Sequence, residues 1–125
     1  MKAERIGHGT RAAEDSDLLD YLAEKQIPIE MCPLSNLRTG VVAAIEEHPV
    51  RDYFERGLLV TVNTDDPKMF GNSLAEEYQT LVERLGFSQN EIRNLISQGI
   101  QASWLPPDQK EILARSFEND PGWAL

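Results

Sequence analysis

The chain reads LLVTVNTDDP over residues 58–67, and this stretch decides the predicted fold class. Its first five residues are apolar or β-branched, which is typical of a short buried strand. Gly57 and Asn63 bound the apolar run on either side. Polar residues follow at once and include the adjacent carboxylates Asp65 and Asp66. We therefore predict a buried strand that opens directly into an acidic loop.

Two segments upstream also have strand character. Residues 27–32 (IPIEMC) form an apolar run, although Pro28 cannot donate to a β-ladder except at a strand's start or edge. Residues 4–6 (ERI) are a third candidate, too short for periodicity alone to decide. Helical patterns alternate with these strands and continue after the last one, over residues 16–25, 49–57, 73–86 and 88–100 and around Ile112, Leu113 and Phe117.

This order of elements predicts an α/β protein with parallel strands. A length of 125 residues suits one domain. We divide it into two βα units over 1–57, a last βα unit over 58–86 and C-terminal helices over 87–125. Three strands could form a small doubly wound sheet or one arc of a barrel, and periodicity does not choose between them.

The composition excludes several function classes. Twenty-one acidic and twelve basic residues give a net charge of −9, which would repel a phosphate backbone, so we expect no nucleic-acid partner. No apolar run approaches the roughly 20 residues that a membrane helix needs. A single cysteine, Cys32, and a start without a signal-peptide pattern favour a reducing, cytoplasmic location.

Polar residues that could carry chemistry follow each predicted strand. His8 lies between glycines after the first, Ser35 and Asn36 follow the second, and Asp65 and Asp66 follow the third. Ligands of α/β proteins bind at the carboxyl ends of parallel strands, and barrel active sites lie there. These residues therefore form a candidate site, because all three strands would end on one rim.

Each of these features also has a purely structural interpretation. A histidine between glycines can be an ordinary loop residue, and Asp-Asp-Pro is a common turn. Cys32 is expected to pack in the core, and His48 before a proline to start a helix. Taken together, however, two adjacent carboxylates on extended backbone would point in different directions, and an imidazole nearby could shuttle a proton. Such a set suits metal-assisted hydrolysis, and residue types and spacing lead no further.

Three motifs in the chain resemble a known family. Residues 4–9 (ERIGHG), 31–36 (MCPLSN) and 63–67 (NTDDP) are similar to the last three strand-end motifs of the adenosine deaminases, in the same order and at similar spacing. Residues 70–78 and 102–104 resemble the C-terminal helices of that family. The resemblance extends over nearly the whole chain.

The resemblance implies a (β/α)₈ TIM-type barrel, of which the chain would supply strands six to eight and the following helices. It implies hydrolytic removal of a purine 6-amino group by a zinc-bound hydroxide, with release of ammonia. His8 would orient the hydroxide and stabilise charge, Asp65 would ligate zinc and act on the bound water, and Asp66 would hydrogen-bond a purine ring nitrogen. The signature of cytidine-type zinc deaminases is absent.

The chain also departs from the family pattern. Family members bind zinc through an H-x-H pair and a further histidine, whereas this chain has two histidines, His8 and His48, outside those motifs. Catalytic zinc usually has three protein ligands, so we expect the chain alone to be inactive and the N-terminal half of a barrel to be its partner. A non-catalytic remnant or interaction domain is the alternative.

The resemblance also bears on the substrate. Adenine deaminases of this family tend to carry Asp where this chain has Gly7. We therefore expect adenosine or another 6-aminopurine nucleoside rather than the free base. A modified nucleoside such as aminodeoxyfutalosine stays open.

Overall fold

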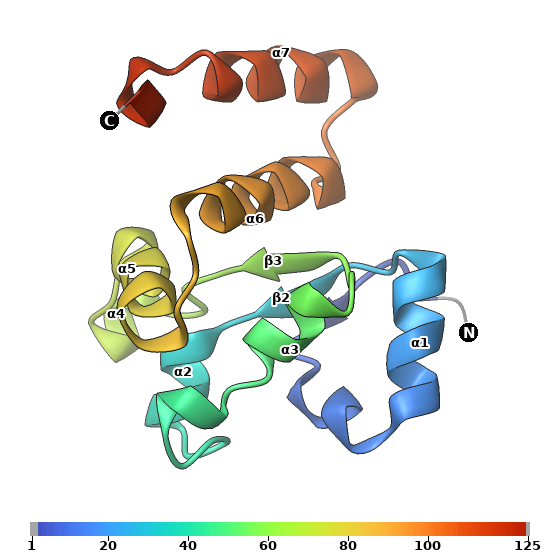
Figure 1. Ribbon diagram of the computed structural model, residues 1–125, viewed down its shortest axis with the longest axis vertical. Helices are drawn as coiled ribbons and strands as arrows, with labels where there is room; N and C mark the ends of the chain where they lie inside the picture. The colour runs from blue at the N-terminus through green and yellow to red at the C-terminus, as the bar shows by residue number, and fades with distance from the viewer. Residues whose placement is uncertain (1–2, 125) are drawn as a thin grey trace.

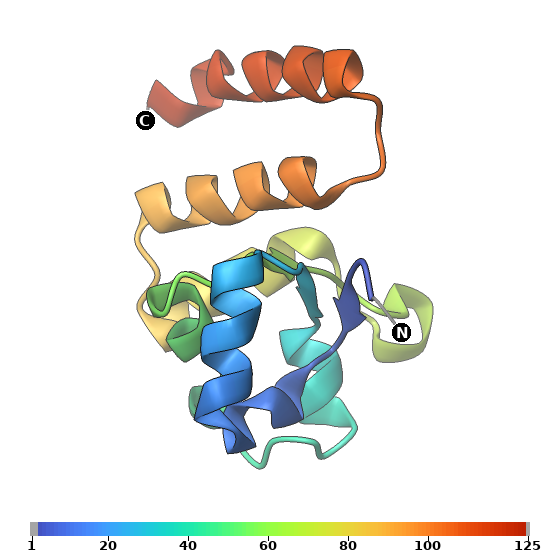
Figure 2. The same cartoon turned by 90° about the vertical axis from the view of Figure 1, so that its right-hand side faces the viewer.

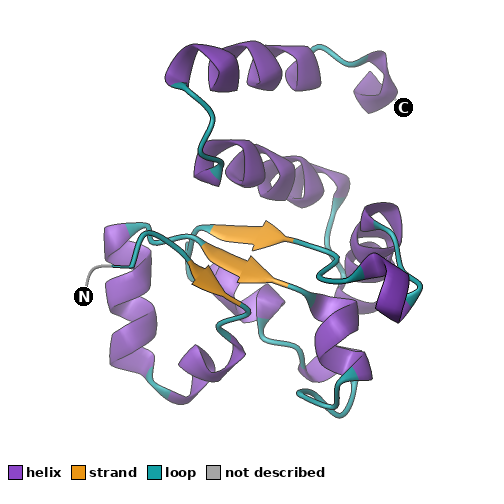
Figure 3. Ribbon diagram, turned by 180° about the vertical axis from the view of Figure 1, so that it is seen from behind, coloured by secondary structure: helices purple, strands orange, loops and turns teal. Residues whose placement is uncertain are grey.

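A computed structural model describes residues 3–124 and contains one three-stranded parallel sheet (Figure 1). The strands are β1 (Ile6–Gly7), β2 (Ile29–Met31) and β3 (Val60–Val62), in the spatial order β1-β2-β3. Figure 3 shows the three arrows pointing the same way. The predicted α/β class with parallel strands is confirmed, although β2 and β3 are shorter than their apolar runs and β1 lies slightly later than the candidate at residues 4–6.

The segments between and after the strands are helical. They are η1 (Thr10–Glu14), α1 (Ser16–Lys25), α2 (Pro33–Arg38), η2 (Ile45–Glu47), α3 (Val50–Glu55), α4 (Pro67–Phe70), α5 (Leu74–Leu85), α6 (Gln89–Ala102), α7 (Pro107–Glu118) and η3 (Pro121–Ala124). The short helices α2 and α4 were not predicted. Both begin with proline, which is preorganised for the first helical position, but four to six residues show too little periodicity to reveal a helix.

The strand order is compatible with both architectures that periodicity left open. A doubly wound sheet reverses its strand order at a switch point. Here the order follows the chain without reversal, as it does around a barrel. Three strands in chain order therefore fit one arc of a barrel, and they equally fit one half of a doubly wound sheet, in which the reversal lies beyond the third strand.

The predicted helix starts are confirmed by their capping contacts. The Asp15 carboxylate accepts a hydrogen bond from Leu18 N at 3.0 Å and caps α1. Ser88 and Glu91 form a reciprocal capping box at the start of α6. Helix α6 packs on β3, and α7 stacks on α6 at the end of the molecule away from the rest of the sheet (Figures 1 and 2). Within residues 3–124, no helix has the length and apolar character needed to span a bilayer.

The core lies between the sheet and the helices. Strand β3 is buried on both faces, as a parallel strand should be. The largest fully buried apolar side chains come from β2 and β3, from the loop before β3, and from helices α1, α3, α5 and α6: Leu19, Leu22, Ile29, Met31, Val50, Tyr53, Leu58, Val60, Leu81 and Leu95. The predicted apolar face of α5 is only partly buried, because Leu74 and Val82 are 47% and 46% exposed.

Two leucines of α5 provide a matched test of this core. Leu81 is fully buried whereas Leu74 is half exposed. Leu81→Ala is therefore expected to lower the free energy of unfolding by about 2–5 kcal/mol, and Leu74→Ala by less than about 1 kcal/mol. Urea unfolding of the two variants, followed by circular dichroism, measures the difference. Equal losses would contradict the packing described here.

Candidate active site

The carboxyl ends of the three strands surround a pocket of about 430 Å³, a size that suits a small molecule. Two of the three predicted site residues, His8 and Asp65, line it together. The full lining is Gly7, His8, Glu30, Cys32, Val62, Asn63, Thr64, Asp65 and Leu74. The expectation that polar residues after separate strands would meet on one rim is confirmed for this pair.

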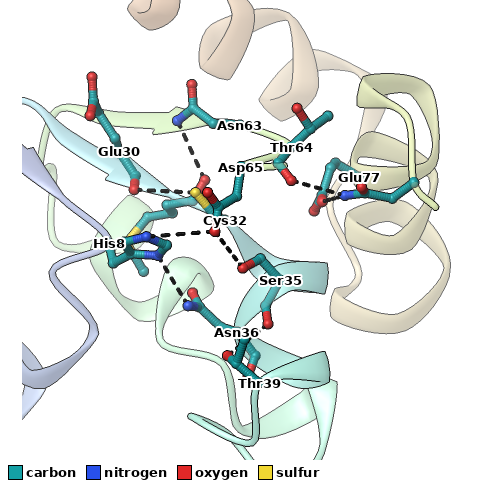
Figure 4. A network of polar contacts seen from close by, with 12 residues as sticks. His8, Glu30, Cys32, Ser35, Asn36, Thr39, Asn63, Thr64, Asp65 and Glu77 are labelled. Carbon is teal, nitrogen blue, oxygen red and sulfur yellow. Dashed lines mark hydrogen bonds and ion pairs between the residues drawn. The ribbon is translucent and has the colours of Figure 1, made fainter. Parts of the chain in front are cut away.

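His8 and Asp65 face each other across the pocket (Figure 4). His8 Nε2 lies 3.8 Å from Asp65 Oδ2, and their side chains are 47% and 38% exposed. The Ser35 hydroxyl donates to the same carboxylate oxygen at 2.7 Å. The carboxylate is thus held from one side by Ser35 and stays open to the pocket on the other.

Both residues have a backbone conformation that side chains rarely adopt. The non-glycine residues with positive φ among those described are His8 (58°), Gln26 (51°) and Asp65 (59°). Gln26 ends α1, where a left-handed residue is ordinary. His8 and Asp65 instead each precede the N-cap residue of a helix, and left-handed backbone outside helix C-termini is associated with functional sites, where the surrounding structure must hold it. The expectation of extended backbone at Asp65 was wrong, because this residue turns the chain out of β3.

Contacts from two other elements hold the loop that carries His8. Gly9 has a φ of 59°, and a Cβ at this position would lie 2.7 Å from Ile29 Cγ2. The Tyr53 hydroxyl lies 2.9 Å from the carbonyl oxygen of Gly9 and 3.0 Å from that of Thr10, and its single proton can be donated to either or shared between them. The loop is therefore pressed against β2 and tied to α3, which fixes where the imidazole enters the pocket.

Two buried side chains, Asn36 and His48, lie on the side of His8 that faces away from the pocket. Asn36 Nδ2 lies 3.2 Å from His8 Nδ1, and Asn36 Oδ1 lies 3.0 Å from His48 Nε2. His48 Nδ1 in turn accepts from Val50 N, the first residue of α3, at 3.2 Å. The expectation that His48 starts a helix is confirmed. Its link to the pocket was not predicted, because it depends on a contact through α2.

Burial lowers the pKa of His48 to about 4, below its usual 6.5. An unfolded chain takes up a proton near 6.5, whereas the folded protein takes it up only near 4. His48 therefore contributes stability that is fully present above pH 6.5 and is lost as the pH falls toward 4. The difference between the unfolded and folded pKa of His48 corresponds to about 3 kcal/mol in the free energy of unfolding.

His48→Gln is expected to remove this part of the acid sensitivity, because glutamine does not titrate. Urea unfolding of the unaltered chain and the variant at about pH 7 and about pH 4 gives the comparison. Between about pH 7 and about pH 4, the free energy of unfolding should fall by up to about 3 kcal/mol more in the unaltered chain than in the variant. An equal loss in both proteins would show that His48 is not buried in its neutral form.

Cys32 lines the pocket but has the character of a core residue. It is 5% exposed, and burial, with the nearby carboxylates of Asp65, Glu77 and Glu30, raises the pKa of its thiol to about 12. The thiol is therefore protonated at neutral pH and is not an activated nucleophile. The predicted packed role is confirmed.

A buried carboxylate supports the site from α5. Glu77 is fully buried, and it accepts hydrogen bonds from Leu34 N at 3.1 Å and from Asn72 Nδ2 at 2.7 Å. Asn72 Nδ2 also lies 3.2 Å from the carbonyl oxygen of Thr64. Burial raises the pKa of Glu77. Glu77 thereby joins the start of α2 to the loop after β3, a role that its place inside a helical pattern did not reveal.

Asp66 is placed differently from the other two predicted residues. Its side chain is exposed, and Oδ1 accepts from Met69 N at 2.9 Å, which caps α4. It does not belong to the lining of the pocket. Its role in binding a purine stays a prediction.

The described residues include one suitable ligand for a metal ion but not a complete set of ligands. Asp65 presents a partly exposed carboxylate at the strand end, which is a suitable oxygen donor for zinc. Over residues 3–124, however, no group of three or more histidine, cysteine, aspartate or glutamate residues is arranged to hold an ion. Further ligands would have to come from outside this part of the chain.

Comparison with known proteins identifies the family. The family model described as adenosine deaminase matches residues 1–119. An aminodeoxyfutalosine deaminase of Streptomyces coelicolor is 43% identical over 118 residues, which are 94% of this chain and 30% of the relative. An adenosine deaminase of Edwardsiella ictaluri is 41% identical over 113 residues, which are 90% of this chain and 34% of the relative.

The structural comparison agrees. The crystal structure of an adenine deaminase from Arthrobacter aurescens superposes with a TM-score of 0.89 at 36% identity, covering 92% of this chain and 35% of the other. The homologues are amidohydrolase TIM barrels, and the chain spans about a third of the length of the relatives it matches. With a family model that covers nearly all of it, the chain belongs to the adenosine deaminase family.

Proposed function

We propose that the chain supplies strands six to eight and the following helices of a (β/α)₈ barrel that hydrolytically removes the 6-amino group of a purine nucleoside. The observation that carries the proposal is the shared pocket of His8 and Asp65 at the carboxyl ends of parallel strands. Membership of the adenosine deaminase family supports the reaction class.

The roles we propose are those that the family resemblance implies, and the shared pocket of His8 and Asp65 supports two of them. Asp65 is one zinc ligand, held by the Ser35 hydroxyl at 2.7 Å, and its second oxygen can accept a proton from water. His8 offers its Nε2 edge to the pocket and stabilises charge that develops beside Asp65. Zinc, when bound, would supply an acidified water. Asp66 would contact the purine ring through Oδ2, because only Oδ1 accepts from Met69 N.

We infer a nucleoside rather than a free base as the substrate. Gly7 lines the pocket, and a Cβ at this position would lie 3.9 Å from Glu30 Oε2, so the missing side chain leaves room on that side. Two relatives bear the names of nucleoside deaminases, an adenosine deaminase and an aminodeoxyfutalosine deaminase, whereas a third is called an adenine deaminase. The space left by the missing side chain of Gly7 favours a nucleoside over the smaller free base.

The test is a chimeric chain in which this sequence replaces the segment of the Streptomyces coelicolor relative that it matches; we call it the completed barrel. We expect it to bind zinc and to release ammonia from adenosine or aminodeoxyfutalosine faster than from adenine. The 125-residue chain alone, assayed in parallel, should release none. A folded, zinc-loaded chimera without activity on any 6-aminopurine would overturn the proposal and favour a non-catalytic remnant.

A further inference from the structure

Three side chains from separate segments form one line of hydrogen bonds that runs from the interior to the pocket. His48 contacts Asn36 at 3.0 Å, and Asn36 contacts His8 at 3.2 Å (Figure 4 shows the His8 end). Asn36 and His48 are only 2% and 3% exposed. The opposite edge of the His8 ring faces Asp65. The line therefore ends on the one nitrogen of His8 that points away from the pocket.

The donor and acceptor of each hydrogen bond in this line can be assigned from its buried end, where His48 contacts Val50 N. The backbone N–H of Val50 can only donate, so Nδ1 of His48 must accept. A neutral imidazole that accepts at Nδ1 has its proton on Nε2. His48 therefore donates through Nε2 to the Asn36 oxygen.

The orientation of the Asn36 amide determines whether Nδ1 of His8 accepts or donates. With its oxygen used by His48, the amide presents its nitrogen to His8 and donates to Nδ1. The reverse amide orientation would set two donors, Asn36 Nδ2 and His48 Nε2, against each other. Nδ1 of His8 is therefore an acceptor, and the neutral ring carries its proton on Nε2.

We propose that Asn36 and His48 are positioning residues that hold His8 in the tautomer with its proton on Nε2, so that the ring offers a hydrogen-bond donor to the pocket. The importance of this for catalysis rests on the proposed deaminase function. Without the line, either ring nitrogen of His8 can carry the proton. A lone pair on Nε2 would then face Oδ2 of Asp65 at 3.8 Å, and the pocket would lose a donor where negative charge develops.

Nitrogen NMR of the 125-residue chain tests the tautomer directly. The chain has two histidines, so its imidazole spectrum contains two ring systems, and His48→Gln identifies which is which. We expect both rings of the unaltered chain to be protonated on Nε2 and unprotonated on Nδ1. A proton on Nδ1 of His8 in the unaltered chain would overturn the proposal.

Asn36→Asp sharpens this test because it changes one donor into an acceptor with little change in shape. One carboxylate oxygen can still accept from His48 Nε2, while the other now faces Nδ1 of His8. We expect Nδ1 of His8 to change from unprotonated to protonated. An Nδ1 that stays unprotonated would show that Asn36 does not set the tautomer.

The completed barrel supplies the kinetic measurement. Asn36→Asp should lower kcat by about 10–100-fold, the range typical of residues that orient a ligand or catalyst, with zinc content and KM nearly unchanged. His48→Phe, which fills the space but cannot donate to Asn36, should lower kcat by about 10-fold. His48→Gln keeps an N–H donor toward Asn36 and should restore much of this loss.

The pattern of the two His48 variants separates positioning from packing. If His48 only fills space, phenylalanine should serve at least as well as glutamine, and that result would overturn the proposal. An unchanged kcat in Asn36→Asp would do the same. If the completed barrel deaminates nothing, the proposed function fails, while the nitrogen spectrum still decides whether Asn36 and His48 set the tautomer.

Discussion

Replacing Asp65 with alanine in the completed barrel is expected to abolish both zinc binding and deaminase activity. Asp65 is the one predicted metal ligand of this chain, and its carboxylate lies at the strand end with Ser35 Oγ at 2.7 Å. Loss of a ligand and of the group that acts on the water should lower kcat/KM by more than about 10⁴-fold, beyond the usual effect of one acid–base group. Zinc is measured by metal analysis of the purified protein and activity by ammonia release.

Two variants make the Asp65 result specific. Asp65→Asn tolerates the left-handed backbone at φ 59° and removes only the charge, so it should fail in the same way. Asp66→Ala changes the neighbouring carboxylate and should keep the zinc while it weakens catalysis. Full activity in Asp65→Ala would place the metal site elsewhere.

The second large effect is expected at His8. His8→Ala should leave zinc in place and lower kcat by about 10²–10⁴-fold, since Nε2 of His8 faces the pocket but is not a proposed ligand. KM should change little, because the lost interaction belongs to the transition state. Steady-state kinetics and zinc content of the same preparation provide the measurement.

Backbone strain in the His8→Ala variant could also lower kcat, and a second variant controls for this effect. His8 has a φ of 58°, where alanine is strained and asparagine is better tolerated. His8→Asn should therefore fold as well as the unaltered protein and show the same loss of kcat. Activity restored in His8→Asn would attribute the effect of alanine to strain rather than to the imidazole.

The sequence was sufficient to predict the parallel α/β order and the meeting of His8 with Asp65. Both predictions depend on local patterns, namely short apolar runs, capping residues and polar groups placed after strands, together with the rule that parallel strands end on one rim. The helix ends at Asp15 and Ser88 were predictable for the same reason, because a cap is made within a few residues of the helix it starts.

What was not predictable depends on contacts between distant segments. The links from Glu77 to Leu34 and from Asn36 to both histidines join elements far apart in the chain, and no local pattern encodes them. The left-handed backbone at Asp65 also had no signal, because an Asp-Asp-Pro turn is compatible with extended residues. The exposure of Leu74 depends likewise on which part of α5 meets the sheet.

The central claim is that the strand ends of this chain form one side of a zinc-dependent deaminase site. A crystal structure of the zinc-loaded completed barrel, with the metal located by its anomalous scattering, tests it most directly. We expect zinc beside the pocket of His8 and Asp65, with an Asp65 carboxylate oxygen at about 2.0–2.2 Å from the ion. Zinc bound elsewhere, or bound in this pocket with Asp65 outside its coordination shell, would contradict the account.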